Sequence, residues 1–203
     1  RLCGMKRAPE MYVMPADRCY IFSIPAKGGT IVASRALVAK LRPEELQAVM
    51  AHEVGHILCR HIRTELALIY IRSSNPVWKF ILLPVYLMDV LMRGWMDVID
   101  YSADRCAMLL MGGSTKVVNA AIVKLALAIV TEADISMEEL DEFLSAPSDA
   151  ETEHKLLERQ IRARKFIDEI PNLRDRIEAL SEFAKTEQAQ RALEKLSQLV
   201  RPA

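Results

Sequence analysis

Residues 43–58 read PEELQAVMAHEVGHIL, and this stretch decides the fold of the chain. Pro43 suits the first position of a helix, and Glu44 and Glu45 favour the positive end of its dipole. The apolar positions that follow are close to helical period: Leu46, Val49, Met50, Val54, Ile57 and Leu58. The pattern predicts one long helix that runs from Pro43 to about Tyr70.

The same stretch contains an HExxH sequence, His52-Glu53-Val54-Gly55-His56. At about 100° per residue, the two histidines lie about 40° apart on one helix face, so both can reach one metal ion. Glu53 lies beside them and can polarise a metal-bound water. The spacing therefore predicts a hydrolytic zinc site. The alternative is a pair of histidines at the edge of the core beside a surface glutamate.

A catalytic zinc needs a third protein ligand and an open position. His61 follows His56 by five residues, which turns it about 140° away on the helix, so we expect it to be structural or exposed. Asp100 and Asp104 are four residues apart and share a face of a later predicted helix. One can bind the metal while the other accepts the second ring N–H of a ligand histidine. Asp97 is a weaker alternative ligand for the metal. The alternative for Asp100 and Asp104 is that both are solvated helix acids.

The composition bounds the remaining possibilities. The chain has 203 residues, is 51% hydrophobic, and carries 27 Lys+Arg against 27 Asp+Glu. This excludes a disordered chain and disfavours a nucleic-acid partner, since such binders are normally basic. The four cysteines form no CxxC pair, which favours reduced thiols and a cytoplasmic setting.

The order of elements predicts an α+β fold, mostly helical, with a small N-terminal sheet. Strands are expected at residues 11–14, 19–24 and 30–34, and helices at 34–41, at 77–111 up to Gly112-Gly113, and from near Ser114. Composition shifts near residue 150. We therefore expect a catalytic domain over residues 1–149, and amphipathic helices over 150–203 that pack on it.

The most apolar stretch, Val77–Ile99, has no uncharged run longer than Phe80–Met88. That run is far shorter than the roughly 18–20 residues of a spanning helix. We expect a buried or interfacial helix kinked at Pro84. The alternatives are a membrane-surface or oligomer contact through this stretch, or membrane association through a segment that precedes Arg1.

The order of these motifs resembles the gluzincin metallopeptidases that include HtpX and the type I CAAX prenyl proteases. The resemblance rests on AHEVGHI at residues 51–57 and DYSADR at residues 100–105, with an apolar stretch between them. A later segment matches the family at Pro171, Arg176, Ile177 and Leu180. The resemblance spans roughly residues 10–185 and implies a zinc-dependent endopeptidase with a zincin-type domain, acting on a peptide or protein substrate.

The resemblance also implies roles for individual residues. The zinc ligands would be His52, His56 and Asp100. Glu53 would be the general base, and Asp104 would orient a ligand histidine. Arg176 would hold the oxyanion or the substrate. A peptide substrate would add as a further strand to the edge strand Cys19–Ile24, at Cys19, Tyr20, Ile21 and Phe22.

Three positions depart from the family pattern. Asp100 replaces a glutamate ligand, Ile170 stands where the family has a histidine, and Arg18 stands at a family asparagine on the edge strand. Loss of a transition-state donor typically lowers the rate about 10²–10³-fold. A weakened or inactive pseudo-peptidase that binds peptides or partner proteins is therefore the alternative function.

Overall fold

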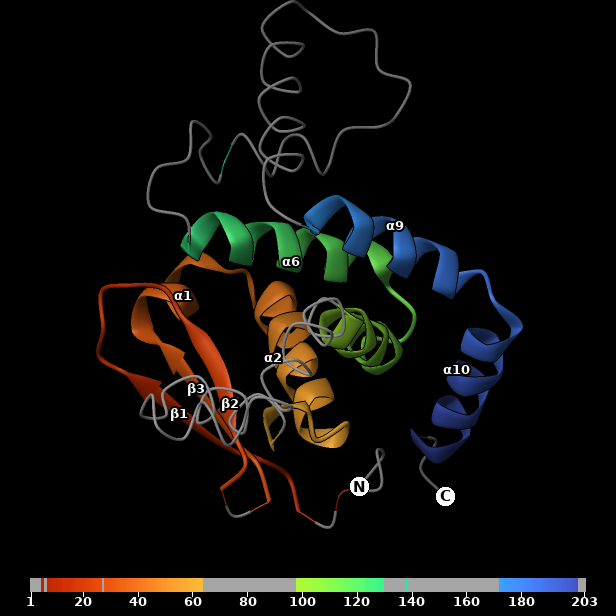
Figure 1. The fold of residues 1–203 in the computed structure, drawn as a ribbon, viewed down its shortest axis with the longest axis horizontal. Helices are drawn as coiled ribbons and strands as arrows, with labels where there is room; N and C mark the ends of the chain where they lie inside the picture. The colour runs from red at the N-terminus through yellow and green to blue at the C-terminus, as the bar shows by residue number, and fades with distance from the viewer. Residues whose placement is uncertain are drawn as a thin grey trace, which may run out of the picture.

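The computed structural model describes Met5, residues 7–26, 28–63 and 98–129, Glu138 and residues 172–200. In these parts of the chain, a small N-terminal sheet lies beside a larger set of helices (Figure 1). The predicted α+β class, mostly helical with a small sheet, is confirmed.

The sheet has three described strands in the order β1-β3-β2. They are β1 (Glu10–Met14), β2 (Ile21–Ile24) and β3 (Thr30–Ser34). The central strand β3 pairs in parallel with β1 and antiparallel with β2. Strand β3 is largely buried, whereas every residue of β1 is exposed. This order leaves β2 as an outer strand of the described sheet.

Strand β2 begins at Ile21, so the prediction that it includes Cys19 and Tyr20 is wrong. The Tyr20 carbonyl still accepts the Ser34 N–H at 3.0 Å, but the Tyr20 N–H donates to the Ser34 side-chain Oγ at 3.1 Å. A side chain thus replaces the backbone acceptor, and the regular strand pairing ends there. The same Ser34 Oγ accepts the Leu37 N–H and caps the next helix, α1 (Arg35–Lys40).

Helix α2 (Pro43–Leu58) begins where the sequence predicts, but it ends well before Tyr70. Arg60 has a φ of 59°, a left-handed conformation that cannot continue a right-handed helix. The Arg60 N–H bonds back to the Ile57 carbonyl at 3.2 Å, and residues 61–63 begin a new helical turn in another direction. Residues 64–70 lie outside the described part.

The core forms where α2 meets three further helical segments: residues 98–110, α6 (Thr115–Ile129) and α9 (Leu173–Ala184). Gly112 and Gly113, both at positive φ, end the first of these as predicted. Leu173 and Leu180 of α9 bury into the same core. The last helix, α10 (Glu187–Val200), follows α9, and Figure 1 shows α2 between the sheet and the helices of this half.

A buried ion pair joins α2 to α6. Lys124 Nζ donates to Glu45 Oε1 at 2.7 Å, and Lys124 is only 2% exposed. Burial alone would raise the pKa of Glu45. The hydrogen bonds from Lys124 and from the Arg42 backbone outweigh that effect and hold this pKa below its ordinary value.

Several predictions fall on residues outside the described part: the kink at Pro84, residues 77–97 of the apolar stretch, Ile170 and Pro171. The boundary near residue 150 also stays a prediction. Among the described residues, no helix combines the length and the apolar character that crossing a membrane requires.

Candidate metal centre

A glycine sets the distance between the two helices that carry the predicted ligands. A Cβ placed on Gly55 of α2 would lie 2.9 Å from the Cα of Ala103 and 3.1 Å from the Cβ of Cys106. Both values are too short for an ordinary contact, so only glycine permits this approach. The contact point lies between Asp100 and Asp104 in sequence, and it brings both acids against the HExxH face of α2.

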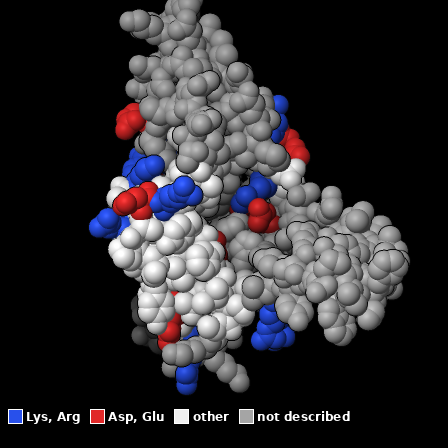
Figure 2. All heavy atoms as spheres, turned by 60° about the vertical axis from the view of Figure 1, so that its left-hand side comes forward, with Lys and Arg blue, Asp and Glu red and all other residues white. Residues whose placement is uncertain are grey.

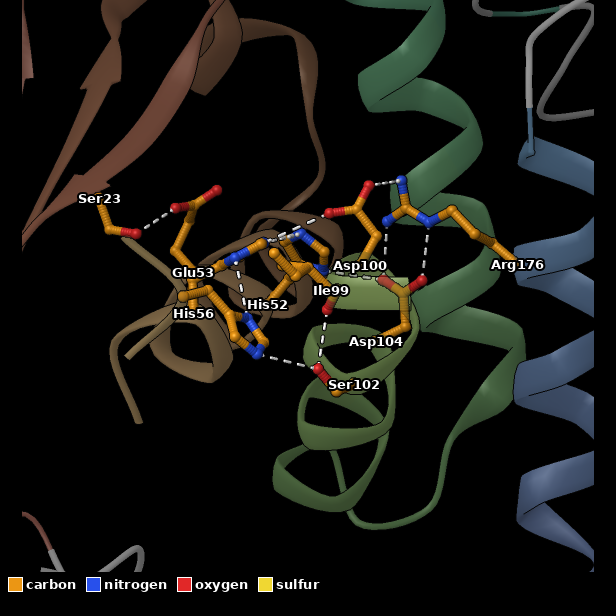
Figure 3. Close-up of polar contacts among 10 residues, drawn as sticks. Ser23, His52, Glu53, His56, Ile99, Asp100, Ser102, Asp104 and Arg176 are labelled. Carbon is orange, nitrogen blue, oxygen red and sulfur yellow. Dashed lines mark hydrogen bonds and ion pairs between the residues drawn. The ribbon is translucent and has the colours of Figure 1, made fainter. Parts of the chain in front are cut away.

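The atoms expected to bind a metal converge. His52 Nε2 and His56 Nε2 are 3.0 Å apart, and His56 Nε2 lies 3.6 Å from Asp100 Oδ1 (Figure 3). One donor atom from each of the three residues fits within a mutual distance of 4.8 Å. Tetrahedral zinc at its usual bond lengths holds neighbouring ligand atoms about 3.3 Å apart. The nitrogen, nitrogen and oxygen donors therefore fit a zinc ion in both type and spacing. Asp97 lies outside the described residues.

Asp104 holds the other side of the His52 ring. Its Oδ1 lies 2.8 Å from His52 Nδ1, and the residue is 1% exposed. Burial by itself would raise the pKa of Asp104, but hydrogen bonds from Arg176 and His52 lower it below its ordinary value. Asp104 is thus an anion that accepts the Nδ1 proton, which leaves the Nε2 lone pair of His52 directed at the centre.

Arg176 of α9 ties both aspartates together. Its Nε and Nη2 each donate to Asp104 at 2.8 Å, and its Nη1 donates to Asp100 Oδ2 at 3.0 Å (Figure 3). Burial would lower the pKa of this guanidinium, yet the two carboxylates raise it, so the charge is retained. In this geometry Arg176 orients Asp100 with Oδ1 toward the histidines. Its expected contact with an oxyanion stays a prediction.

Glu53 lies beside the histidines on α2, and its Oε2 accepts a hydrogen bond from Ser23 Oγ of β2 at 2.7 Å. Burial raises the pKa of Glu53, and the negative charge of Asp100 adds to this. The bond from Ser23 and the nearby His52 partly oppose the shift. A carboxylate with a raised pKa accepts a proton more readily, as a general base requires. Sequence reasoning missed Ser23, because nothing in a strand pattern pairs it with a residue thirty positions away.

The prediction that His61 points away from His56 is wrong. His61 is 8% exposed, and its Nδ1 lies 3.3 Å from His56 Nδ1, with the two rings edge to face at 5.2 Å. The helical-wheel estimate failed because α2 ends at Leu58 and the left-handed Arg60 turns the chain back. His61 Nε2 in turn lies 3.2 Å from Ser102 Oγ, a second residue that sequence reasoning missed.

His56 is a neutral imidazole. Burial is the main cause, and the neighbouring His52, His61 and Arg176 add to it, so the pKa of His56 falls to about 3. A neutral imidazole is the form that binds metals. His56 is therefore already in the form that binds a metal.

The outer strand β2 runs beside this centre. The Ser34 N–H bond to the Tyr20 carbonyl fixes the alternation of the antiparallel pair, so the backbone groups of Ile21 and Ser23 point away from β3. Figure 2 turns the sheet side of the molecule forward and shows a hollow in that face, with acidic and basic side chains at its edge.

The profile of peptidase family M48 matches residues 2–184 of this chain. The plastoglobule-localized metallopeptidase 48 of Arabidopsis thaliana is 33% identical over 122 residues, which are 59% of this chain and 35% of that protein. Protease HtpX of Chromohalobacter salexigens is 36% identical over 95 residues, 46% of this chain and 31% of that protein.

The matched part thus spans about a third of the length of these two relatives. No solved structure matches the chain. The family match covers the sheet, α2, α9 and the helical residues 98–110, here called the aspartate helix because they carry Asp100 and Asp104. These are the elements that build the centre. The chain belongs to peptidase family M48.

Proposed function

We propose that this chain forms the catalytic part of a zinc-dependent endopeptidase. The observation that carries the proposal is the convergence of His52 Nε2, His56 Nε2 and Asp100 Oδ1 within 4.8 Å, with Glu53 next to His52 on the same helix. Two nitrogens and one carboxylate oxygen are the protein donor set of a hydrolytic zinc site. Relatives are named as a metallopeptidase and as the protease HtpX, which agrees with this chemistry.

The aspartate in place of a glutamate ligand does not disqualify the site. An aspartate is one methylene shorter, so its helix must lie closer to the histidines. The glycine contact permits such a close approach, because Ala103 packs against Gly55 where any other residue would place a Cβ. Arg176 also holds one oxygen of Asp100, so the other oxygen stays directed at His56.

The residues of the chain divide the hydrolysis between them. When bound, zinc supplies Lewis-acid polarisation of a water and of the scissile carbonyl. Glu53 takes a proton as the water attacks the peptide carbon, and then passes this proton to the leaving amine. Ser23 steers the Glu53 carboxylate by its 2.7 Å hydrogen bond. Asp104 keeps His52 in one tautomer throughout.

The substrate is an extended peptide laid along β2. The backbone groups of Ile21 and Ser23 face the open edge and can pair with a peptide backbone. Alternate side chains of such a peptide point to one face of the sheet, where the half-exposed Phe22 offers an apolar contact. Backbone pairing fixes the register, so the scissile bond is presented near Glu53.

A pseudo-peptidase that binds peptides without cutting them is the second candidate function. It is favoured by Ile170 at the position of the family histidine and by the contacts of Arg176. Three bonds of the Arg176 guanidinium go to Asp100 and Asp104, so an oxyanion would compete with two carboxylates for it.

Zinc content and peptide cleavage measured on Glu53→Gln separate the two functions. We expect the variant to keep the zinc of the parent and to lose nearly all hydrolysis, because the amide cannot accept the proton. Glu182→Gln is the matched control, since Glu182 is an exposed residue of α9. Cleavage by Glu53→Gln at the rate of the parent would refute the mechanism. A parent that binds zinc and peptide but never cleaves would support the pseudo-peptidase.

A further inference from the structure

His61 lies in a row of polar groups that crosses from α2 to the aspartate helix. His61 Nδ1 is 3.3 Å from His56 Nδ1, and His61 Nε2 is 3.2 Å from Ser102 Oγ. Ser102 Oγ is in turn 2.8 Å from the backbone carbonyl of Ile99 (Figure 3). The row therefore starts at one expected metal ligand, His56, and ends at the residue that precedes another, Asp100.

The chemistry of the last group fixes the direction of every bond in the row. A carbonyl oxygen only accepts, so Ser102 must give its single hydroxyl proton to Ile99. The Ser102 oxygen can then only accept from His61, which puts the His61 proton on Nε2 and a lone pair on Nδ1. His56 must therefore carry its proton on Nδ1.

The opposite direction conflicts with the shortest contact in the row. It would require Ser102 to donate to His61 instead. The Ser102 oxygen and the Ile99 carbonyl oxygen would then face each other at 2.8 Å with no proton between them. Two oxygen lone pairs at a hydrogen-bond distance repel, so the geometry favours the first direction.

We propose that His61, Ser102 and the Ile99 carbonyl, here called the His61 relay, hold His56 in the tautomer that binds a metal through Nε2. This inference deepens the proposed function and rests on it. His61 is a positioning residue, because it acts on the metal through His56. The two ligand histidines thus have different supports: an aspartate behind His52 and a neutral imidazole behind His56.

The chosen direction has a close contact of its own, which lies at the centre itself. With Nδ1 protonated on both rings, the two Nε2 lone pairs face each other at 3.0 Å. That arrangement is unfavourable alone and becomes favourable when a cation accepts both pairs. The local backbone also serves the relay, because the left-handed turn at Arg60 is what brings His61 back against His56.

Four single variants separate the relay from simple packing. In His61→Leu the volume stays while the acceptor is lost, whereas the amide oxygen of His61→Gln can still accept from His56. Ser102→Ala removes the acceptor for His61. Ser181→Ala is the matched control, because Ser181 Oγ donates to the Ile177 carbonyl at 2.9 Å in the same way on α9, away from the centre.

Zinc affinity by competition with a chelator is the first measurement. We expect His61→Leu to weaken zinc binding about 10–100-fold, as loss of a partner behind a metal ligand typically does. Ser102→Ala should weaken it less, and His61→Gln and Ser181→Ala should stay close to the parent. Equal losses in His61→Leu and His61→Gln, or no loss in His61→Leu, would overturn the relay.

The tautomer of His61, read from its ring nitrogens by ¹⁵N NMR, is the second measurement, and it does not need zinc. Protonation at Nε2 supports the relay, and protonation at Nδ1 overturns it. A parent that takes up no zinc would refute the proposed function. The relay would then be judged by the His61 tautomer alone, so the two failures are distinguishable.

Discussion

The two halves of helix α2 both bury charged or titratable side chains, but these side chains have different kinds of partner. In the first half, Glu45 accepts bonds from Lys124 and from the Arg42 backbone, and both partners of the ion pair are almost fully buried. In the second half, His52 and His56 direct ring nitrogens toward Asp100, whose side chain is 40% exposed. A buried charge is tolerated in a core when its partner is present, and removing one partner destabilises the fold. Donor atoms that converge beside an accessible carboxylate are expected to bind a metal ion.

Lys124→Met removes the ion pair of the first half of α2 and has the largest expected effect. It leaves the Glu45 carboxylate buried without its cation, which should lower the free energy of unfolding by about 3–5 kcal/mol. Denaturant unfolding measures the change. The double variant Glu45→Leu/Lys124→Met should recover part of the loss, because no charge then stays buried. A single variant as stable as the parent would contradict the role given to this pair.

Gly55→Ala disrupts the helix contact that positions the side chains of the second half of α2. The added Cβ would meet Ala103 at 2.9 Å, so the aspartate helix must move away from α2. We expect a loss of about 1–3 kcal/mol in stability, together with weaker zinc binding as Asp100 withdraws. Gly28→Ala is the steric control for zinc affinity, since a Cβ there meets no atom within 4 Å. Of these two glycines only Gly28 has a positive φ, so its variant is compared in zinc affinity and not in stability. Unchanged zinc affinity in Gly55→Ala would show that the helix distance does not set the site.

A pH titration of stability sharpens the comparison. The folded pKa of Glu45 lies below its ordinary value of 4.5, so the unfolded chain binds this proton first as the pH falls. The stability supplied by the pair is therefore complete above about pH 4.5 and is lost as the pH falls through the lower folded value. Unfolding of the parent and of the double variant, measured from pH 6 to pH 3, should converge toward the acid end. Parallel curves would contradict this assignment.

The smallest expected effect concerns Ser23→Ala. Its hydrogen bond lowers the pKa of Glu53 against the upward shift from burial, so removing it should raise that pKa further. The acid limb of kcat/KM against pH should therefore move to higher pH, with little change in zinc content. Ser181→Ala should leave the profile unchanged. A shift toward lower pH in Ser23→Ala would refute the assigned role of this bond.

The sequence predicted the residues whose spacing lies within one helix. His52 and His56 are four residues apart, as are Asp100 and Asp104, so each pair lies on one helix face. Both segments are helical in the structure. It also predicted the small sheet and the stop at Gly112-Gly113. These features depend on local periodicity and on residues that favour turns.

The features it missed all depend on contacts between segments. Ser23 meets Glu53 only because β2 lies against α2, and Ser102 meets His61 only because two helices pack at Gly55. His61 was misplaced because a helical wheel assumes that the helix continues. The sequence does not mark the left-handed turn, because the residue there is Arg60 and not the glycine that usually adopts this conformation.

Zinc per chain, determined by elemental analysis on protein purified without added metal, tests the central claim most directly. The account predicts about one zinc in the parent, much less in Asp100→Ala, and parent-like content in Asp17→Ala, an exposed aspartate near the sheet. Equal zinc in the parent and in Asp100→Ala would contradict the ligand set. No zinc in the parent, even after it is added back, would contradict the metal centre itself.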